Sequence, residues 1–272
     1  MSENAPVFVL LTDFGLTDPY VGQLKAALFA RAPSVPILDL SHDVPPFAVN
    51  TGAFFLAASR QYYPPGAIFI CIVDPGVGSN RDLLCIRNKT HSLLGPNNGL
   101  LHLAYRDMSD NGSVSVHTIP VGHLATNTFH GRDILVPAAT ALALAPDDAK
   151  FIDTPRTYPI MAPDWAEATR GTDELFCTVL HVDRFGNCIL NLRNTEGLLL
   201  YPRLSLQTLR TKRSIVLHQV DHYAEIAPNS LGILPGGQGF YELAMNGASA
   251  AAALSLGSGE SCRILGNLWK EG

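Results

Sequence analysis

The sequence is poor in charged residues and carries no excess of basic ones. Only 16% of its 272 residues are charged, and the formal net charge is −5. Domains that bind nucleic acids usually gather lysine and arginine on one surface, whereas these residues are scattered here. We therefore predict no nucleic-acid partner. Hydrophobic residues make up 47% of the chain, which is enough for a large core with little disorder.

Long hydrophobic runs and cysteine pairs are also missing. No apolar run approaches the roughly 20 residues of a membrane span, and the N-terminus has neither the basic start nor the apolar segment of a signal peptide. The five cysteines are widely spaced, without a C-x-x-C pair. Such spacing is typical of buried free thiols in a reducing compartment. We expect a soluble, cytoplasmic protein with no membrane association.

Several motifs for phosphate and metal binding are absent too. The sequence has no P-loop and no G-x-G-x-x-G fingerprint, so nucleotide phosphates are not the expected ligand. It also lacks the H-E-x-x-H pattern of a zinc enzyme, and its cysteines are unpaired. We predict no metal site.

The first part of the chain alternates short apolar runs with helical segments. Runs at 7–11, 37–40 and 68–73 read as buried strands, and the segments 18–32 and 47–61 read as helices. This alternation predicts βαβ units and a parallel sheet. We expect an N-terminal α/β domain over residues 1–160, a Rossmann-like sheet with helices on both faces.

The composition changes after residue 145. Prolines without periodicity over 145–163 read as a linker. The segments beyond it that read as strands are short and separated by turns: 175–181, 187–192, 214–217, 230–234, 240–244 and 262–265. Regularly spaced short strands predict a small barrel or sandwich. We expect a smaller C-terminal domain over residues 161–272, an antiparallel β-barrel.

Polar residues follow two of the predicted buried strands. Asp13 follows the first strand, and Asp74 ends the strand 68–73, ahead of a glycine-rich turn and Arg81. Open α/β sheets bind ligands at such carboxyl ends. An Asp, an Arg and a His that converge can orient and deprotonate a water molecule, and His130 could supply the imidazole. Alternatively, Asp74 is a solvated strand end and His130 an ordinary turn residue.

Six short motifs occur in the same order as in a known family. In these motifs the sequence resembles the S-adenosyl-L-methionine (SAM) hydroxide adenosyltransferases, relatives of the SAM-dependent fluorinase and chlorinase. The resemblance covers about residues 7 to 265. In chain order the motifs are Leu11-Thr12-Asp13-Phe14-Gly15, Val73-Asp74-Pro75-Gly76-Val77-Gly78, Gly95-Pro96-Asn97-Asn98-Gly99-Leu100, Phe129-His130-Gly131-Arg132-Asp133, Val182-Asp183-Arg184-Phe185-Gly186-Asn187 and Glu242-Leu243-Ala244-Met245-Asn246-Gly247.

The resemblance implies hydrolysis of SAM to adenosine and L-methionine, with water or hydroxide attacking the ribose C5′ carbon. SAM is then the substrate, and no cofactor is needed. The water-activating residues of the family correspond to Asp74, Arg81 and His130. In the halogenases, by the same resemblance, the Asp position carries Tyr and the Arg–His pair is lost.

The resemblance also implies binding roles for five residues. Asp13 corresponds to the residue that binds the ribose hydroxyls. Asp183 and Asn187 correspond to those that hold the amino-acid part of SAM, and Phe185 and Asn246 would flank the adenine. The family is trimeric, so we expect a homotrimer with its site at the subunit interface.

One segment departs from the family pattern. Members commonly read Asn-Ser-x-Gly where this chain reads Gly236-Gly237-Gln238-Gly239. The serine that helps to hold the methionine carboxylate is missing, which puts tight SAM binding in question. Two alternatives to hydrolysis stay open: a SAM-dependent halogenase and, because of this segment, a non-catalytic sensor that binds SAM or adenosine.

Overall fold

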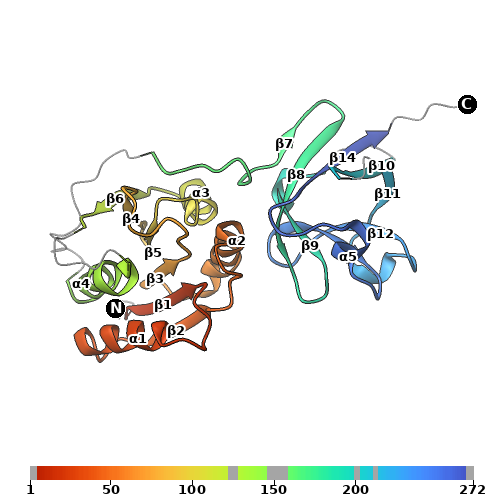
Figure 1. Cartoon of the computed structure of the whole chain (residues 1–272). Coiled ribbons are helices and arrows are strands. Elements are labelled where there is room, and N and C mark those ends of the chain that lie inside the picture. The colour runs from red at the N-terminus through yellow and green to blue at the C-terminus, as the bar shows by residue number, and fades with distance from the viewer. Residues whose placement is uncertain (1–4, 122–127, 146–158, 199–202, 211–213, 268–272) are drawn as a thin grey trace, which may run out of the picture. The chain divides into compact units, whose positions relative to one another are not determined.

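The computed structural model describes residues 5–121, 128–145, 159–198, 203–210 and 214–267 (Figure 1). It divides into two compact units, residues 1–163 and 164–272, which we call the N-unit and the C-unit. The expected linker falls largely on residues 146–158, which lie outside the described ranges. No helix within those ranges is long and apolar enough to cross a membrane.

The N-unit contains a six-stranded sheet in the order β2-β1-β3-β5-β4-β6. β4 runs antiparallel to both of its neighbours, and the other strands share one direction. A short turn joins β4 to β5, and only antiparallel neighbours can be joined so tightly. The strands are β1 (Val7–Thr12), β2 (Ile37–Ser41), β3 (Ala67–Ile72), β4 (Leu83–Arg87), β5 (Ser92–Pro96) and β6 (Ser115–Ile119).

Helices cover both faces of this sheet, as predicted (Figure 1). Leu24 and Leu28 of α1 pack with Phe8 and Leu10 of β1, and residues of α4 join the same cluster. On the other face of the sheet, α2 packs beside α3. Gly52 of α2 lies close to Val73, since a Cβ at Gly52 would be 3.1 Å from Val73 Cγ2. The helical elements are α1 (Tyr20–Arg31), α2 (Val49–Ser59), η1 (Arg60–Tyr62), α3 (His102–Asp110), the π-helical turn η2 (Gly131–Leu135) and α4 (Val136–Leu144).

The C-unit is a closed β-barrel, as the spacing of its strands predicts. Seven strands form a ring that the pairing of β14 with β8 closes, and β7 pairs with β8 outside the ring. Every neighbouring pair is antiparallel except β11 with β12. The strands are β7 (Thr169–Arg170), β8 (Glu174–Val182), β9 (Cys188–Arg193), β10 (Arg203–Thr208), β11 (Ser214–Gln219), β12 (Leu231–Pro235), β13 (Phe240–Met245) and β14 (Ser261–Asn267).

Three short helical segments accompany the barrel, and its interior is apolar. Leucine, isoleucine, valine and cysteine side chains fill it, among them Leu190, Ile233 and Ile264, and Ala250 and Leu254 of α5 pack against them. The segments are η3 (Asn194–Glu196), η4 (Tyr223–Glu225) and α5 (Ala250–Leu254).

All five cysteines are buried and free, as their spacing predicts. Burial raises the pKa of Cys85, Cys177 and Cys188 to about 12. A thiol is nucleophilic only as the thiolate. These cysteines therefore pack in the two cores and offer no nucleophile.

Candidate active site

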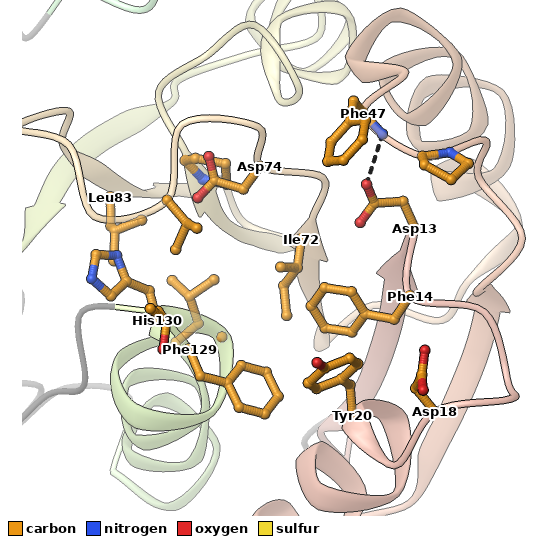
Figure 2. A pocket seen from close by; sticks show the side chains of 16 residues that line it. Asp13, Phe14, Asp18, Tyr20, Phe47, Ile72, Asp74, Leu83, Phe129 and His130 are labelled. Carbon is orange, nitrogen blue, oxygen red and sulfur yellow. Dashed lines mark hydrogen bonds between the residues drawn. The ribbon is translucent and has the colours of Figure 1, made fainter.

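A cavity of about 410 Å³ opens in the N-unit near the ends of β1 and β3 (Figure 2). We call it the N-unit cavity. Three residues that the sequence singles out, Asp13, Asp74 and His130, line it together. The other lining residues are Phe14, Asp18, Tyr20, Pro46, Phe47, Ile72, Val77, Leu83, Pro96, Thr128, Phe129, Gly131 and Leu135.

Asp74 follows the buried end of β3 and is held from behind by Arg81. Arg81 Nη2 donates to Asp74 Oδ2, and Arg81 Nη1 donates to Ser79 Oγ at 2.8 Å. Gly76 leaves room for this contact, because a Cβ there would lie 3.0 Å from Arg81 Nη1. Arg81 is not among the lining residues. It therefore orients the carboxylate without facing the cavity.

The second oxygen of Asp74 has no hydrogen-bond partner. The side chain is 8% exposed, and Oδ1 is buried without a donor. Burial raises the pKa of Asp74 above its usual value, while the charge and hydrogen bond of Arg81 and, less strongly, the backbone N–H of Gly76 and the charge of His130 act in the opposite direction. A buried carboxylate oxygen without a partner is costly. A water or hydroxyl group in the cavity would satisfy it.

His130 lies directly before the π-helical turn η2 and is buried. Its charge, when protonated, lowers the pKa of Asp74, so the two groups interact. Gly131 holds the turn close to β3, since a Cβ there would lie 2.5 Å from Ile72 Cδ1. Arg132 pairs with the adjacent Asp133 (Nε to Oδ1, 2.7 Å) outside the cavity lining.

Asp13 lies in the loop after β1. Its Oδ2 accepts a hydrogen bond from the backbone N–H of Phe47 at 2.9 Å (Figure 2). The loop is fixed beneath this residue, because Thr12 Oγ1 lies 2.8 Å from His42 Nδ1 and Gly15 N donates to the His42 carbonyl at 2.8 Å. Asp13 therefore has an oxygen available for a ligand.

Aromatic residues of this cavity were missed by the sequence analysis. Phe14, Tyr20 and Phe129 form a mutual cluster with ring centroids 5.5 to 5.9 Å apart. Phe14 and Phe129 lie inside the quoted motifs, so their positions could have indicated that they belong to the site. No motif contains Tyr20. With Ile72 and Leu83 they make most of the cavity wall apolar.

The charge of the N-unit cavity has one sign. Asp13, Asp18 and Asp74 line it, and no lysine or arginine occurs among its described lining residues. The helix predicted over 18–32 was expected to begin at Asp18, but α1 begins at Tyr20, with Pro19 at its cap position. Asp74 is paired with Arg81, and the two remaining carboxylates, Asp13 and Asp18, favour a cationic ligand.

A second cavity, of about 840 Å³, lies in the C-unit. We call it the C-unit cavity. The four binding residues expected in this part of the chain, Asp183, Phe185, Asn187 and Asn246, all line it. The other lining residues are Tyr223, Gly237, Gln238, Glu242, Met245, Gly247, Ala248 and Ser249.

Asp183 and Asn187 form one hydrogen-bonded turn between β8 and β9. Asp183 Oδ1 accepts from the backbone N–H groups of Phe185 (2.9 Å) and Asn187 (2.8 Å). Asp183 Oδ2 accepts from Asn187 Nδ2 at 2.9 Å. Gly186 permits this turn with a φ of 85°. The carboxylate is thus fixed in place, and Oδ2 can still accept from an ammonium group.

Phe185 and Asn246 present different surfaces to the C-unit cavity. Phe185 is 80% exposed, so its ring can cover a planar ligand. Asn246 Nδ2 donates to the Ile226 carbonyl at 3.1 Å, which fixes its side chain.

Glu242 and Tyr223 are two lining residues without an assigned role in the sequence analysis. Glu242 lies in β13 and is 5% exposed. Its Oε2 accepts from Tyr223 Oη at 2.6 Å. Glu242 belongs to a quoted motif, but the contact with Tyr223 joins residues 19 positions apart and leaves no sequence signal.

The described residues contain no group of three His, Cys, Asp or Glu side chains that could hold a metal ion. His218 and His222 are four positions apart, a spacing that places ligands together on a helix. His218, however, lies in strand β11 and His222 beyond its end.

Comparisons with known proteins agree with this arrangement. Residues 8–150 match the SAM hydroxide adenosyltransferase N-terminal domain, and residues 177–263 match the C-terminal domain of the same family. The chain is 33% identical over 270 residues to a protein of Thermus thermophilus named (R)-S-adenosyl-L-methionine hydrolase, covering 96% of this chain and 99% of that one.

A solved structure, described as a conserved hypothetical protein from Thermus thermophilus, superposes with a TM-score of 0.74 at 30% identity, covering 96% of this chain and 100% of that one. A fluorinase of Actinoplanes sp. is more distant, at 21% identity over 222 residues that cover 70% of this chain and 73% of that one. With both family domains matched in order, the chain belongs to the SAM hydroxide adenosyltransferase family.

Proposed function

We propose that this protein is an enzyme that hydrolyses SAM to adenosine and L-methionine, by attack of water or hydroxide at the ribose C5′ carbon. The observation that carries the proposal is the buried Asp74 carboxylate at the N-unit cavity, with Oδ2 held by Arg81 and Oδ1 without a partner. Relatives named SAM hydrolase, similar over nearly the whole chain, support it.

The reaction needs a nucleophile but no acid for the leaving group. A C5′–O bond forms as the C5′–S bond breaks, and the electron pair of that bond remains on sulfur. The positively charged sulfonium thereby becomes a neutral thioether, and the water loses one proton. Asp74 Oδ1 accepts a hydrogen bond from the water, orients it and takes the proton that the water loses, while His130 stands at the same cavity. Such positioning and proton transfer account for much of catalysis.

The charges of the N-unit cavity suit this substrate better than its product. Asp74 is paired with Arg81, so Asp13 and Asp18 are the carboxylates that attract the sulfonium cation, whereas adenosine is neutral. The apolar wall excludes bulk water, which strengthens these interactions. A negative cavity also disfavours a halide ion at Asp74, so the geometry supports hydrolysis over halogenation.

We assign the binding roles to residues of the two cavities, as the resemblance implies. Asp13 accepts hydrogen bonds from the ribose hydroxyls, since its carboxylate is fixed at the N-unit cavity. Asp183 and Asn187 hold the amino-acid part, and Phe185 and Asn246 flank the adenine at the C-unit cavity. No cofactor takes part, because SAM is consumed as the substrate.

The test of this function is incubation of the purified protein with SAM and quantification of products by liquid chromatography. We expect adenosine and methionine in equal amounts, at a rate that added chloride or fluoride does not change. Halide-dependent formation of a 5′-halo-adenosine would establish the halogenase alternative. SAM that is bound but stays intact would establish the sensor.

We also propose that the enzyme is a homotrimer whose complete site takes one cavity from each of two neighbouring subunits. The support is that the catalytic residues line a cavity of the N-unit, whereas Asp183 and Asn187 line a separate one in the C-unit. Co-expression of Asp74→Asn chains with Asp183→Ala chains tests this. Random mixing in a symmetric trimer restores about a quarter of the sites. Activity no greater than the sum of the two variants would contradict it.

A further inference from the structure

Glu242 is a buried carboxylate at the C-unit cavity that the assigned roles leave unused. Its Oε2 is occupied by Tyr223 Oη, and no described donor is bonded to Oε1. Burial raises the pKa of Tyr223, and the Glu242 carboxylate raises it further. The phenol therefore keeps its proton and donates to Glu242. The carboxylate is fixed in one orientation beside the ligand space.

The position of Glu242 depends on the glycine at 236. A Cβ built on Gly236 would lie 2.1 Å from Glu242 Oε1 and 2.6 Å from its Cδ. Any other residue at 236 would displace the carboxylate from this place. Gly236 therefore permits the position in which the Glu242 carboxylate faces the cavity.

Asp183 and Glu242 together make the C-unit cavity acidic. The Asp183 charge adds to burial in raising the pKa of Glu242, while the Tyr223 hydrogen bond opposes both, so the two carboxylates are close enough to repel each other. No lysine or arginine occurs among the described residues that line this cavity. A cation between the two carboxylates would relieve the repulsion, and a third carboxylate would increase it.

We propose that Glu242 is a specificity-determining residue, and that the C-unit cavity selects the substrate by the ammonium group of its tail rather than by a carboxylate. This inference rests on the proposed function, because it concerns the tail of the same sulfonium substrate. The substrate class is thus adenosyl sulfonium compounds with an ammonium-bearing tail, including decarboxylated SAM, whose tail is a 3-aminopropyl group. The bonds that form and break at C5′ are the same for both substrates.

The first experiment compares kcat/KM for SAM and for decarboxylated SAM in the full-length protein, with adenosine as the product measured. We expect decarboxylated SAM to be used at least as well as SAM, because it keeps the ammonium and lacks the repelled carboxylate. A kcat/KM for decarboxylated SAM ten or more times below that for SAM would overturn the proposal.

Glu242→Gln then removes the charge and keeps the shape. Weaker ammonium binding affects both substrates and cancels in the ratio of their kcat/KM values. Relief of the repulsion helps only SAM, so the ratio of SAM to decarboxylated SAM should rise about tenfold. An unchanged ratio would overturn the assignment of Glu242.

Tyr223→Phe is the matched control for a merely structural role. It removes the hydrogen bond that opposes the rise in the pKa of Glu242, so the comparison is made at alkaline pH, where the carboxylate stays ionised. Both substrates should then be affected alike and the ratio kept. A ratio that moves as far as in Glu242→Gln would assign the effect to the lost hydrogen bond and overturn the proposal.

Gly237→Ser gives a test that does not touch Glu242. A Cβ at Gly237 meets nothing within 4 Å, so the serine fits and adds a donor for a carboxylate. We expect a severalfold gain in kcat/KM for SAM and none for decarboxylated SAM, with Gly237→Ala as the control that lacks the hydroxyl. An equal gain for both substrates would contradict selection by the tail. If the wild type releases adenosine from neither substrate, the proposed function itself fails, which differs from every outcome above.

Discussion

The two cavities of this protein are built in different ways, and the difference explains their chemistry. In the N-unit, Asp13 and Asp74 follow β1 and β3, neighbouring parallel strands whose ends meet at one edge of the sheet. In the C-unit, Asp183 lies in a turn and Glu242 lies inside a strand, bonded to Tyr223 from another segment. The first arrangement leaves a carboxylate oxygen free for a water molecule. The second holds the Asp183 and Glu242 carboxylates in fixed positions beside the space for a ligand.

This comparison predicts a division of labour. Variants of the N-unit cavity should act mainly on kcat, since that cavity holds the reacting atoms. Variants of the C-unit cavity should act mainly on KM, because they touch a part of the substrate that does not react. Four predictions test this comparison of the two cavities.

The largest effect is expected for Asp74→Asn. The amide cannot accept the proton of the water, so kcat should fall by about 10²–10⁴-fold while KM for SAM changes little. Steady-state kinetics measures both. Asp110→Asn, at the exposed end of α3, is the control and should leave both unchanged. A large rise in KM with normal kcat would break the division.

Asp183→Ala should have the next largest effect, of the opposite kind. Loss of a charge-assisted contact to the ammonium should raise KM about 10–100-fold, with kcat changed much less. Isothermal titration with SAM gives an independent measure of the affinity. If kcat falls as far as it does in Asp74→Asn, the C-unit cavity also shapes the reacting geometry and the comparison fails.

Arg81→Met should change the pH dependence of the N-unit reaction. Burial raises the pKa of Asp74 and Arg81 opposes this, so removal of Arg81 raises the pKa further. The reaction needs the ionised carboxylate, and activity is lost as pH falls through that pKa. The acidic limb of the kcat/KM profile should therefore move to higher pH, with about a tenfold loss of rate. Arg31→Met at the end of α1 should leave the limb in place, and an unmoved limb in Arg81→Met would contradict the role of the pair.

The smallest effect concerns the packing beneath the two cavities. Gly131→Ala places a Cβ 2.5 Å from Ile72 Cδ1, whereas a Cβ at Gly237 meets nothing within 4 Å. Overpacking typically costs about 1–3 kcal/mol, so Gly131→Ala should lower the Tm by several degrees and Gly237→Ala should not. Thermal unfolding followed by circular dichroism measures both. Equal Tm values would show that the N-unit cavity is less tightly packed than its geometry indicates.

The sequence predicted most of the N-unit because its signals are local. The apolar run before Asp74 marks β3, and the alternation of such runs with helices predicts the sheet. The sequence favours a strand over 83–87, but the antiparallel direction of β4 was not predicted, since strand direction depends on a short connection rather than on periodicity. In the C-unit, β7 was too short to recognise. β10 was missed although Arg203–Thr208 alternates apolar and polar residues as a half-buried strand does.

The candidate sites show the same limit. Asp74, His130 and Asp183 could be identified because each stands in a short motif, and the structure places them at the two cavities. Tyr20 and Tyr223 could not, because their positions depend on contacts between distant segments: Tyr20 with Phe129, and Tyr223 with Glu242. Local patterns predict which residues end strands, but not which distant side chains complete a cavity.

The most direct test of the central claim is the origin of the 5′ oxygen of adenosine. Purified protein is incubated with SAM in ¹⁸O-labelled water, and the adenosine is analysed by mass spectrometry. Attack by water at C5′, oriented by Asp74, predicts one ¹⁸O atom in each adenosine molecule, at the 5′ position. Adenosine without the label, or labelled homoserine released together with methylthioadenosine, would show that the nucleophile does not attack C5′ and would contradict the account.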